Sequence, residues 1–560
     1  MPLKPIFEKY PLMTMNSLPL RPGQARIADE KMTTLYGLTV QAEHRHEVWE
    51  GAFRLAALLK SKPLEEPVAC WINDAFAKQQ EDGAFDMELS KALCVACAGL
   101  AMYEYDARRP LLEKLISFCA WVAENWKDVI ACGAVRQHSA DLMAFLQQLY
   151  RVTGKKAILS LCDKLRQQAM DWSGILHTFA VQRPMNRVTA WEDMKAGMEA
   201  ENGSEEGFYT RQYLTCHGES LADGLRSSCL NGRFSGNGHE LSAARTGWEK
   251  IHRYHGAVCG GITADETIGG RSPSCGVDAA SLGAWAESLA QADDQETWAF
   301  EALDTLVHNG LPAALVNDKL VPYQRVNSLS VNSGTKDCYN VHDCEEQAWR
   351  AVARLSRGWA AAASHAVTMQ PHGCAVNLLM NGKFAISTED GAFVAAVEGD
   401  TMTISAKKPV KASIRVRIPA WTDDACITIN NEGGLEGKPG SWLELDRVWH
   451  NGDTIRMDFA AALKVTGGHH QSSCISFGPN VMAYVPADDC WAVALVDGPV
   501  MQDGQVVATL RPTQQWRKRS GIPADLPVLP ETEGECFTAV LRPYAEAPCR
   551  IALFPKGDKE

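Results

Sequence analysis

The stretch IHRYHGAVCGGITADETIGGRSPSCGVDAA, residues 251–280, has glycine pairs at 260–261 and 269–270 on either side of the acidic pair Asp265-Glu266. Paired glycines interrupt a helix and let the backbone turn sharply. A third acid, Asp278, follows a Pro/Ser/Cys/Gly turn and opens an alanine-rich helical run. The pattern predicts carboxylates held on loops at the mouth of a helical scaffold. The bland alternative is that these acids are solvated loop and cap residues.

The sequence around this stretch, from about residue 27 to residue 363, has the period of amphipathic helices. In residues 138–172, apolar residues recur at helical spacing on both sides of a Thr153-Gly154 break, which predicts two helices joined by a short turn. Similar helix pairs are predicted for residues 48–77, 90–125 and 279–310. Successive helix pairs form either a solenoid or a closed toroid. Because no short fixed-period repeat is found, we expect the toroid.

The period changes to two after about residue 370. In ASIRVRIPAW, residues 412–421, apolar side chains alternate with Arg415 and Arg417. Such alternation, interrupted by Gly, Asn and Pro turns, is typical of an antiparallel β-sandwich.

These patterns divide the chain into four parts. We expect an extended N-terminal segment at 1–25, a helical toroid at 26–368 and a β-sandwich at 369–465. A β-rich region at 466–560 is expected to pack on the sandwich or on the toroid. Residues 182–247 are less regular and rich in Gly, Asn, Ser and charge, so they are expected to form loops at the rim of a pocket.

Composition limits the function classes. The 560 residues carry a net charge of −13, which argues against nucleic acid or an anionic membrane as the main partner. The first 20 residues lack the apolar core of a signal peptide, and no apolar run is long enough to span a bilayer. Together with 18 cysteines, this predicts reduced thiols and a cytoplasmic location. Cys94 and Cys97 form a CxxC that we interpret as buried apolar residues.

Several motifs resemble a known family. RIPAW at 417–421, the Asn-Asn turn that follows, and LDRVWHNGDTIRMDF at 445–459 resemble the β-sandwich of glycoside hydrolase family 127 and its relatives. Further pieces of the family pattern are WEG at 49–51, LYRVTGKK at 149–156, GGITADE at 260–266 and YxxxNxL at 323–329. The resemblance covers about residues 40–485 and implies an (α/α)6 toroid followed by antiparallel β-sandwich domains.

The resemblance also implies an activity. The family hydrolyses β-L-arabinofuranosides with retention, using a glutamate as acid/base and a zinc-bound cysteine as nucleophile. Glu266 resembles the family's acid/base, and His138 in QHSAD and His217 in CHGES resemble histidines that contact the substrate. Tyr323 and Trp49 are further candidates for substrate binding, because aromatic rings can stack on a sugar face.

The sequence departs from the family at the metal site. Where the family has Glu-x-Cys, this chain has Asp278-Ala279-Ala280, and where the family has Cys-Cys it has Asp343-Cys344. Two of the three zinc thiolates are therefore absent, and no cofactor is expected. The alternative is a zinc site rebuilt from Asp278, Cys344 and either Cys338 or Cys275.

The nucleophile has three candidates. A retaining glycosidase needs a carboxylic acid and a nucleophile about 5 Å apart. With Glu266 as the acid, we rank Asp343 first as a carboxylate nucleophile. An inverting reaction, in which Asp278 or Asp343 activates water, ranks second. A Cys344 thiolate activated by His342 ranks third. Asp343 is equally well interpreted as the N-cap of the following helix.

The sequence therefore predicts a glycoside hydrolase that cleaves a non-reducing-end, L-arabinofuranoside-like sugar from a small glycoside or oligosaccharide. A lyase or epimerase on the same toroid, and a carbohydrate-binding protein without catalysis, are the alternatives. The expected partner is a small carbohydrate, with no nucleic acid and no membrane. The oligomeric state is open, with a homodimer as one option.

Overall fold

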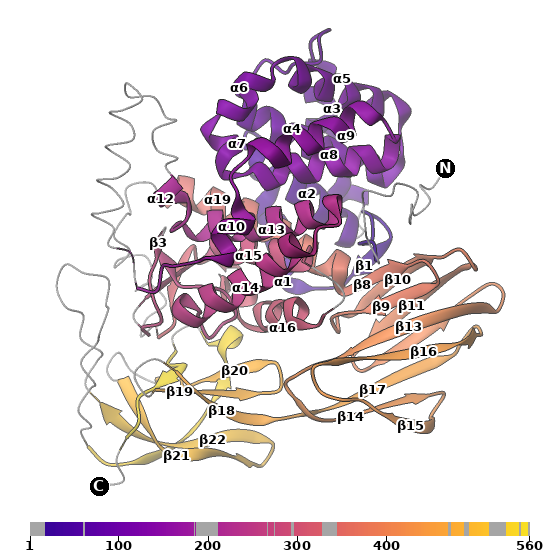
Figure 1. Ribbon diagram of the computed structural model, residues 1–560. Coiled ribbons are helices and arrows are strands. Elements are labelled where there is room, and N and C mark those ends of the chain that lie inside the picture. The colour runs from indigo at the N-terminus through magenta and orange to yellow at the C-terminus, as the bar shows by residue number, and fades with distance from the viewer. Residues whose placement is uncertain are drawn as a thin grey trace.

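Helices form a ring that stands against layers of β-strands (Figure 1). The computed structural model describes residues 17–59, 62–183, 185, 211–265, 267–273, 275–292, 296–327, 344–468, 472–486, 492–513, 534–547 and 550–557. Among these residues, no helix is long and apolar enough to cross a membrane.

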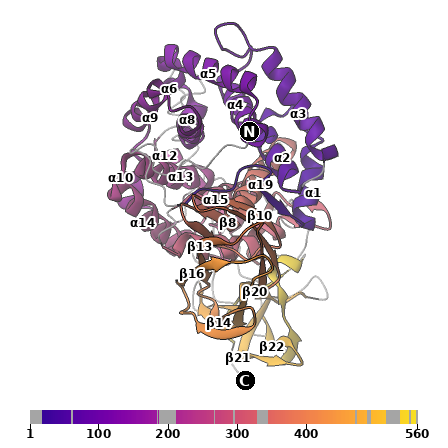
Figure 2. The same ribbon diagram turned by 90° about the vertical axis from the view of Figure 1, so that its right-hand side faces the viewer.

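The inner wall of the ring consists of helices that contact one another in cyclic order. They are α2 (His46–Leu59), α4 (Leu89–Asp106), α8 (Ser139–Thr153), α13 (Gly218–Ser235), α15 (Ala279–Ala290) and α19 (Cys344–Ala366). Each contacts the next along the chain, and α19 contacts α2, so the ring is closed. Figure 2 shows this arrangement. The predicted toroid is confirmed, and the absence of a sequence repeat was the correct reason to prefer it to a solenoid.

An outer layer of helices covers the ring. It includes α1 (Glu30–Thr39), α3 (Lys62–Ala77), α5 (Arg109–Glu124), α6 (Trp126–Ala131), α7 (Gly133–Gln137), α9 (Lys156–Gln168), α10 (Trp172–His177), α12 (Arg211–Leu214), α14 (Gly238–His255) and α16 (Trp298–Thr305). The predicted pair at 138–172 is α8 followed by α9. Helix α8 ends because Gly154 adopts a left-handed φ of +65°, where a side chain would be strained. A π-turn at Leu306–Gly310 continues α16 into the short α17 (Leu311–Ala313).

Two sheets form the sandwich. One has the order β1 (Ala25–Ile27), β10 (Gly382–Ser387), β11 (Ala392–Glu398), β12 (Thr401–Ser405), β17 (Thr454–Ala461), β14 (Thr422–Ile429) and β15 (Glu432–Glu436). The other has the order β16 (Ser441–Trp449), β13 (Val410–Ile418), β9 (Gly373–Val376) and β8 (Val367–Gln370). Most pairs are antiparallel, as expected, but β9 and β13 run parallel. Ile414, Val416 and Ile418 of β13 are fully buried, which confirms the alternation seen in the sequence.

The C-terminal strands form two further sheets. One contains β18 (Leu463–Gly467), β19 (Ser473–Phe477), β20 (Asn480–Ala483), β24 (Arg542–Pro543) and β25 (Leu553–Phe554). The other contains β21 (Ala492–Gln502), β22 (Gln505–Thr513) and β23 (Phe537–Val540). At the other end of the chain, β1 pairs with β10, so the N-terminal segment joins the sandwich before the ring begins. A small hairpin, β5 (Leu315–Val316) and β6 (Lys319–Leu320), follows α17.

Arg417 ties the sandwich to the ring, from the face of β13 opposite the buried apolar side chains. Its side chain is only 2% exposed, and its two Nη atoms donate to Glu301 Oε1 and Asp304 Oδ2 of α16, each at 2.7 Å. Trp421, at the end of the same RIPAW motif, donates its indole N–H to Asp304 Oδ2 at 2.9 Å. The motif is therefore an interface between the two parts of the molecule.

Candidate active site

The N-terminal ends of the inner helices meet at one mouth of the ring. Arg354, in the first half of α19, contacts Glu219 in the first turn of α13, and Asp223 one turn later. Asp223 in turn contacts His138, the residue immediately before α8. Because each contact joins the N-terminal half of one inner helix to the N-terminal half of another, these helices run parallel to one another around the ring. Their positive dipole ends therefore lie at the same mouth.

A small sheet brings the glycine-rich stretch to this mouth. It has the order β3 (Thr267–Ile268), β2 (Ala264–Asp265), β4 (Gly276–Asp278) and β7 (Tyr323–Arg325). In this sheet Asp278 is opposite Tyr323, and a separate bridge joins Thr267 to His217. Three of the predicted site residues, Asp278, Tyr323 and His217, thus come from distant parts of the sequence to one place.

The turn before this sheet requires glycine. Gly260 has a φ of +102°, and a Cβ built there would lie 2.7 Å from the backbone nitrogen of Leu306. The chain therefore passes directly against the π-turn after α16, and any side chain would push it away. Glu266 itself lies outside the described residues, between Asp265 of β2 and Thr267 of β3.

His217 is a buried, neutral base. Burial, and then the neighbouring Arg350, lower the pKa of its imidazole to about 3. Arg350 Nη2 lies 3.1 Å from His217 Nε2. His217 Nδ1 lies 3.0 Å from Ser220 Oγ and accepts the Ser220 backbone N–H at 3.3 Å. Contacts to both ring nitrogens therefore hold the ring at the N-terminus of α13.

Arg350 holds a carboxylate beside this histidine. Its Nε donates to Glu219 Oε1 at 2.5 Å, and Arg354 Nε donates to Glu219 Oε2 at 3.0 Å. Although burial opposes ionisation, these two guanidinium groups keep the pKa of Glu219 well below its ordinary value. The pKa of Arg350 is raised despite its burial, first by Glu219 and then by Asp278, so Asp278 lies within its electrostatic range.

His138 is oriented by a second carboxylate. Its Nδ1 lies 2.6 Å from Asp223 Oδ2, and Arg354 Nη2 donates to the same oxygen at 2.7 Å. Arg354 Nη2 also lies 2.9 Å from His138 Nδ1, so both members of the Asp223–Arg354 ion pair hold this ring nitrogen. The side chain of His138 is 28% exposed, whereas that of Asp223 is 2% exposed. The histidine is therefore the accessible member of the pair.

A deeper layer of charges closes the ring below these residues. Asp141 of α8 lies 2.5 Å from Arg226 of α13 and accepts a hydrogen bond from Arg357 of α19 at 3.1 Å. Arg357 also donates to Glu287 of α15 at 2.7 Å. Although burial opposes it, Arg357 and Arg226 hold the pKa of Asp141 well below its ordinary value. This layer fills the middle of the ring with paired charges.

Two of the positions that the resemblance assigns to the zinc site, Asp278 and Ala280, lie among the described residues, and neither supplies a thiolate. Asp278, at the position of the family's glutamate ligand, caps α15 by accepting a hydrogen bond from the Ala280 backbone N–H at 2.9 Å. Ala280 stands where the family has a thiolate and supplies no donor atom, and the Arg350 cation nearby would repel Zn²⁺. Among the residues that the structure describes, no group of three or more His, Cys, Asp or Glu side chains could hold a metal.

Trp49, another predicted site residue, is not brought into this group. Trp49 is 5% exposed, and its ring lies 6.2 Å from that of Trp71 on α3, so it packs between the inner and outer helices. Asp343 and the side chain of Cys344 lie outside the described part of the chain. Burial raises the pKa of the Cys94 thiol to about 12, so this member of the CxxC is a neutral thiol.

Four charged residues at the mouth were not predicted: Glu219, Asp223, Arg350 and Arg354. A pattern that could have found them is present in the sequence. Glu219 and Asp223 are four residues apart, as are Arg350 and Arg354, so each pair shares one helix face. Opposite charges at this spacing on two inner helices are a reason to expect contact across the ring.

The buried histidines predict a loss of stability in mild acid. Burial lowers the pKa of His217 to about 3 and those of His255 and His365 to about 4. At pH values between the unfolded pKa of about 6.5 and these folded pKa values, the unfolded chain binds more protons than the folded protein does. Stability is therefore lost as pH falls below about 6.5, by about 2 kcal/mol for each histidine at pH 5. Urea unfolding should show a lower midpoint at pH 5 than at pH 7; an equal or higher midpoint contradicts this.

Comparison with known proteins agrees with this fold. Residues 374–461 match the family model described as beta-L-arabinofuranosidase, GH127 middle domain. A solved structure described as a glycoside hydrolase superposes with a TM-score of 0.69 at 14% identity, covering 97% of this chain and 98% of its own. A comparison with curated proteins finds no match.

Two further solved structures are described as GH127 enzymes. A beta-L-arabinofuranosidase from Geobacillus stearothermophilus T6 has a TM-score of 0.63 at 14% identity, covering 94% of this chain and 93% of its own. A GH127 beta-arabinofuranosidase has a TM-score of 0.57 at 14% identity, covering 97% and 98%. Similarity to solved structures at this level of sequence identity establishes the fold alone. The family model adds sequence similarity in the middle domain. The predicted resemblance is confirmed: the chain is similar to glycoside hydrolase family 127 proteins in its overall fold and in the sequence of its middle domain.

Proposed function

We propose that the protein is a glycoside hydrolase that removes a non-reducing-end, L-arabinofuranoside-like sugar from a small glycoside or oligosaccharide in the cytoplasm. The observation that carries the proposal is the meeting of His217, Asp278, Tyr323 and the strands on both sides of Glu266 at one mouth of the ring. A fold alone does not define an activity, because activity depends on the site. Here the fold and the site suggest the same reaction class.

We assign acid/base catalysis to Glu266 and nucleophilic attack to Asp343. Glu266 protonates the glycosidic oxygen as the bond to the anomeric carbon breaks, while an Asp343 oxygen bonds to that carbon. Water then displaces Asp343, and Glu266 takes the proton of that water. Asp278 is ionised beside Arg350 in this scheme and helps to keep Glu266 protonated through its negative charge. An inverting reaction with Asp278 or Asp343 as base remains the second choice, and a Cys344 thiolate the third.

Substrate binding follows from the histidine geometry. His138 is 28% exposed and its Nδ1 is held by Asp223 and Arg354, which leaves its Nε2 edge to hydrogen-bond to a sugar hydroxyl. His217 and Tyr323 lie next to Asp278 in the same assembly and contribute the opposite wall of the sugar site. Trp49 remains the weakest of the four candidates, because it is packed away from this group.

The test is hydrolysis of a panel of aryl furanosides and pyranosides, with and without a chelator. We expect release of the aryl group from L-arabinofuranosides, with a rate that the chelator leaves unchanged. A rate abolished by the chelator would instead require a thiolate–metal site. Formation of an unsaturated sugar would identify a lyase, and sugar binding without turnover would identify a carbohydrate-binding protein.

A further inference from the structure

The C-terminal region of the chain reaches the small sheet at the mouth of the ring. Strand β7, which carries Tyr323, is followed by a bend that contains Asn327, the asparagine of the YxxxNxL motif. The side-chain oxygen of Asn327 accepts hydrogen bonds from the backbone N–H groups of Ala552 at 2.9 Å and Leu553 at 3.0 Å. Its Nδ2 donates to the Leu553 carbonyl at 2.8 Å. The asparagine of the motif therefore binds the backbone of the C-terminal segment both as acceptor and as donor.

A second contact joins the same two parts of the chain. Arg550 donates through Nη2 to the side-chain oxygen of Gln324, the middle residue of β7. Both residues are buried, with Arg550 2% exposed and Gln324 3% exposed. Arg550 Nη1 donates to the Ala547 carbonyl at 2.7 Å, and the guanidinium lies 4.0 Å from the centre of the Tyr544 ring. Because these contacts hold the guanidinium in place, it fixes Gln324 and with it the middle of β7.

The two faces of β7 have different partners. Successive side chains of a strand point to opposite faces, so Gln324 and Tyr323 point away from each other. Gln324 faces Arg550 and the C-terminal region. Tyr323 is directly opposite Asp278 of β4 in an antiparallel pair, so these two side chains share the other face. A contact on one face of the strand can thus control the position of a side chain on the other.

The C-terminal segment that holds β7 is itself anchored in a sheet. Leu553 of β25 is paired with Cys474 of β19. Ile551 and Tyr484 exchange two backbone hydrogen bonds, at 2.8 and 2.9 Å. Because the sheet fixes this backbone, the groups that bind Asn327 do not follow β7 if that strand moves.

The same sheet supports a second segment that leads to the mouth. Asn309, in the π-turn after α16, is fully buried. It donates to the Pro479 carbonyl at 2.9 Å and accepts from the Val481 backbone N–H at 2.8 Å, at the start of β20. The glycine-rich stretch passes directly against this π-turn at Gly260. The C-terminal sheet therefore supports both the segment before β2 and the strand β7.

We propose that Asn327 and Arg550 are positioning residues of the sugar site, which hold β7 against β4 and so keep Tyr323 in place for the substrate. This inference rests on the proposed function, in which Tyr323 forms part of a wall of the sugar site. A displacement of about 1 Å in a binding group can cost about a hundredfold in rate, so the support behind this strand matters for catalysis. The C-terminal region thus contributes to substrate binding from behind the site.

The experiment is a double-mutant cycle on the full-length protein, with an aryl L-arabinofuranoside as substrate. Asn327→Ala should lower kcat/KM at least about tenfold, mainly through a higher KM, because it weakens binding through Tyr323. In a Tyr323→Ala background, the same change should cost no more than about twofold, because its effect acts through the ring that is already absent. Arg550→Lys keeps the charge but loses the paired donors, and it should behave in the same way.

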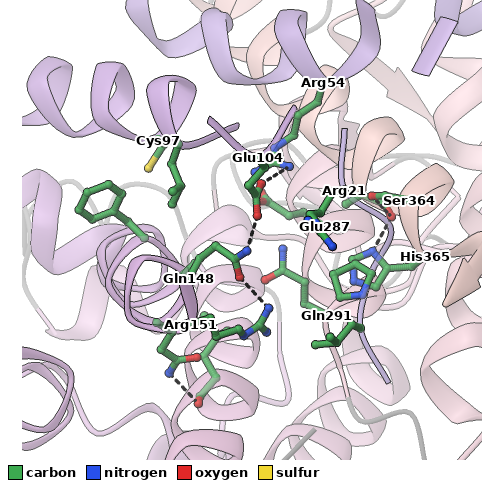
Figure 3. Close-up of a pocket in the computed structure, with 18 of the residues that line it drawn as sticks. Arg21, Arg54, Cys97, Glu104, Gln148, Arg151, Glu287, Gln291, Ser364 and His365 are labelled. Atoms are coloured by element: carbon green, nitrogen blue, oxygen red, sulfur yellow. Dashed lines mark hydrogen bonds and ion pairs between the residues drawn. The ribbon is translucent and has the colours of Figure 1, made fainter. Parts of the chain in front are cut away.

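Gln148→Ala is the matched control. Gln148 is also a partly buried amide, and it bridges Glu104 and Arg151, with its oxygen bonded to Arg151 Nη1 at 2.6 Å (Figure 3). These residues lie near the C-terminal ends of α4 and α8, at a cavity of about 390 Å³ away from the mouth. We expect Gln148→Ala to lower stability and to leave KM unchanged, with and without Tyr323→Ala.

The outcomes separate positioning from general support of the fold. If Asn327→Ala costs as much in the Tyr323→Ala background as in the wild type, or leaves KM unchanged, the inference is overturned. If Asn327→Ala does not fold, Arg550→Lys decides the question by the same cycle.

Hydrogen exchange keeps the inference separate from the proposed function. If the wild type hydrolyses no glycoside, the proposed function fails, and the exchange rates of backbone amides in β4 and β7 become the test. Asn327→Ala should speed exchange in these strands, whereas Gln148→Ala should not. Equal exchange in the two variants would show that Asn327 does not hold β7.

Discussion

Arg417→Met is expected to destabilise the protein by about 3–5 kcal/mol, the usual cost of removing one partner from a buried ion pair. Arg417 Nη1 and Nη2 donate to Glu301 and Asp304, and its Nε donates to the Asn377 carbonyl at 2.5 Å. Although burial opposes it, Arg417 and then His308 hold the pKa of Asp304 well below its ordinary value. Methionine fills a similar volume but leaves Asp304, 5% exposed, without its main counter-charge.

The measurement is unfolding in urea, followed by both fluorescence and circular dichroism. Because the chain has several parts, the two probes should separate in the variant, with the sandwich losing its contact to the ring first. Arg415→Met is the matched control, since Arg415 lies on the same strand two residues away, partly exposed over the Trp442 ring at 4.6 Å. We expect Arg415→Met to shift the midpoint of urea unfolding only slightly. Equal midpoints for the two variants would mean that the Arg417 contacts do not hold the sandwich to the ring.

Arg417 also shows what a sequence pattern can and cannot predict. Period-two alternation correctly predicted which face of β13 is buried, because that depends on local geometry. It places Arg417 on the opposite face of the strand, but alternation carries no information about a second domain that covers that face. The resemblance of RIPAW to a family motif was the only sequence feature that set this arginine apart from Arg415.

The site was predictable to a similar extent. Turn residues and helix caps are local features, so the sequence located Asp278 at the start of α15. The expectation of loops over residues 182–247 was wrong for α13 and the first half of α14, because the Gly, Asn and Ser residues there are tolerated in helices packed within the ring. The closed ring brings the N-terminal ends of the inner helices together, so the prediction of a toroid already implies that residues at these ends are neighbours. The charge pairs of Arg350 and Arg354 depend on the rotation of α19 about its axis. That rotation is set by packing against α2 and α15, which no single stretch of sequence specifies.

Glu266→Gln is expected to lower the rate of glycoside hydrolysis by roughly 10²- to 10⁴-fold, the usual contribution of a general acid/base. Glutamine keeps the size and hydrogen-bonding capacity of the side chain but cannot transfer its proton. The loss should depend on the leaving group: it should be largest for alkyl glycosides, whose oxygen needs protonation, and smallest for dinitrophenyl glycosides, whose departing phenolate does not. A structural role for Glu266 would lower all these rates by the same factor.

Three further variants complete the assignment. Asp265→Asn changes the neighbouring acid on the same turn and should leave the leaving-group dependence as in the wild type. Asp343→Asn should abolish turnover for every leaving group, because attack at the anomeric carbon is required whatever departs. If Asp343→Asn remains active while Cys344→Ser does not, the nucleophile is the thiolate and the third of the three mechanisms holds. If Glu266→Gln retains its rate on alkyl glycosides, Glu266 is not the acid, and the helix-capping carboxylate of Asp278 becomes the remaining described candidate.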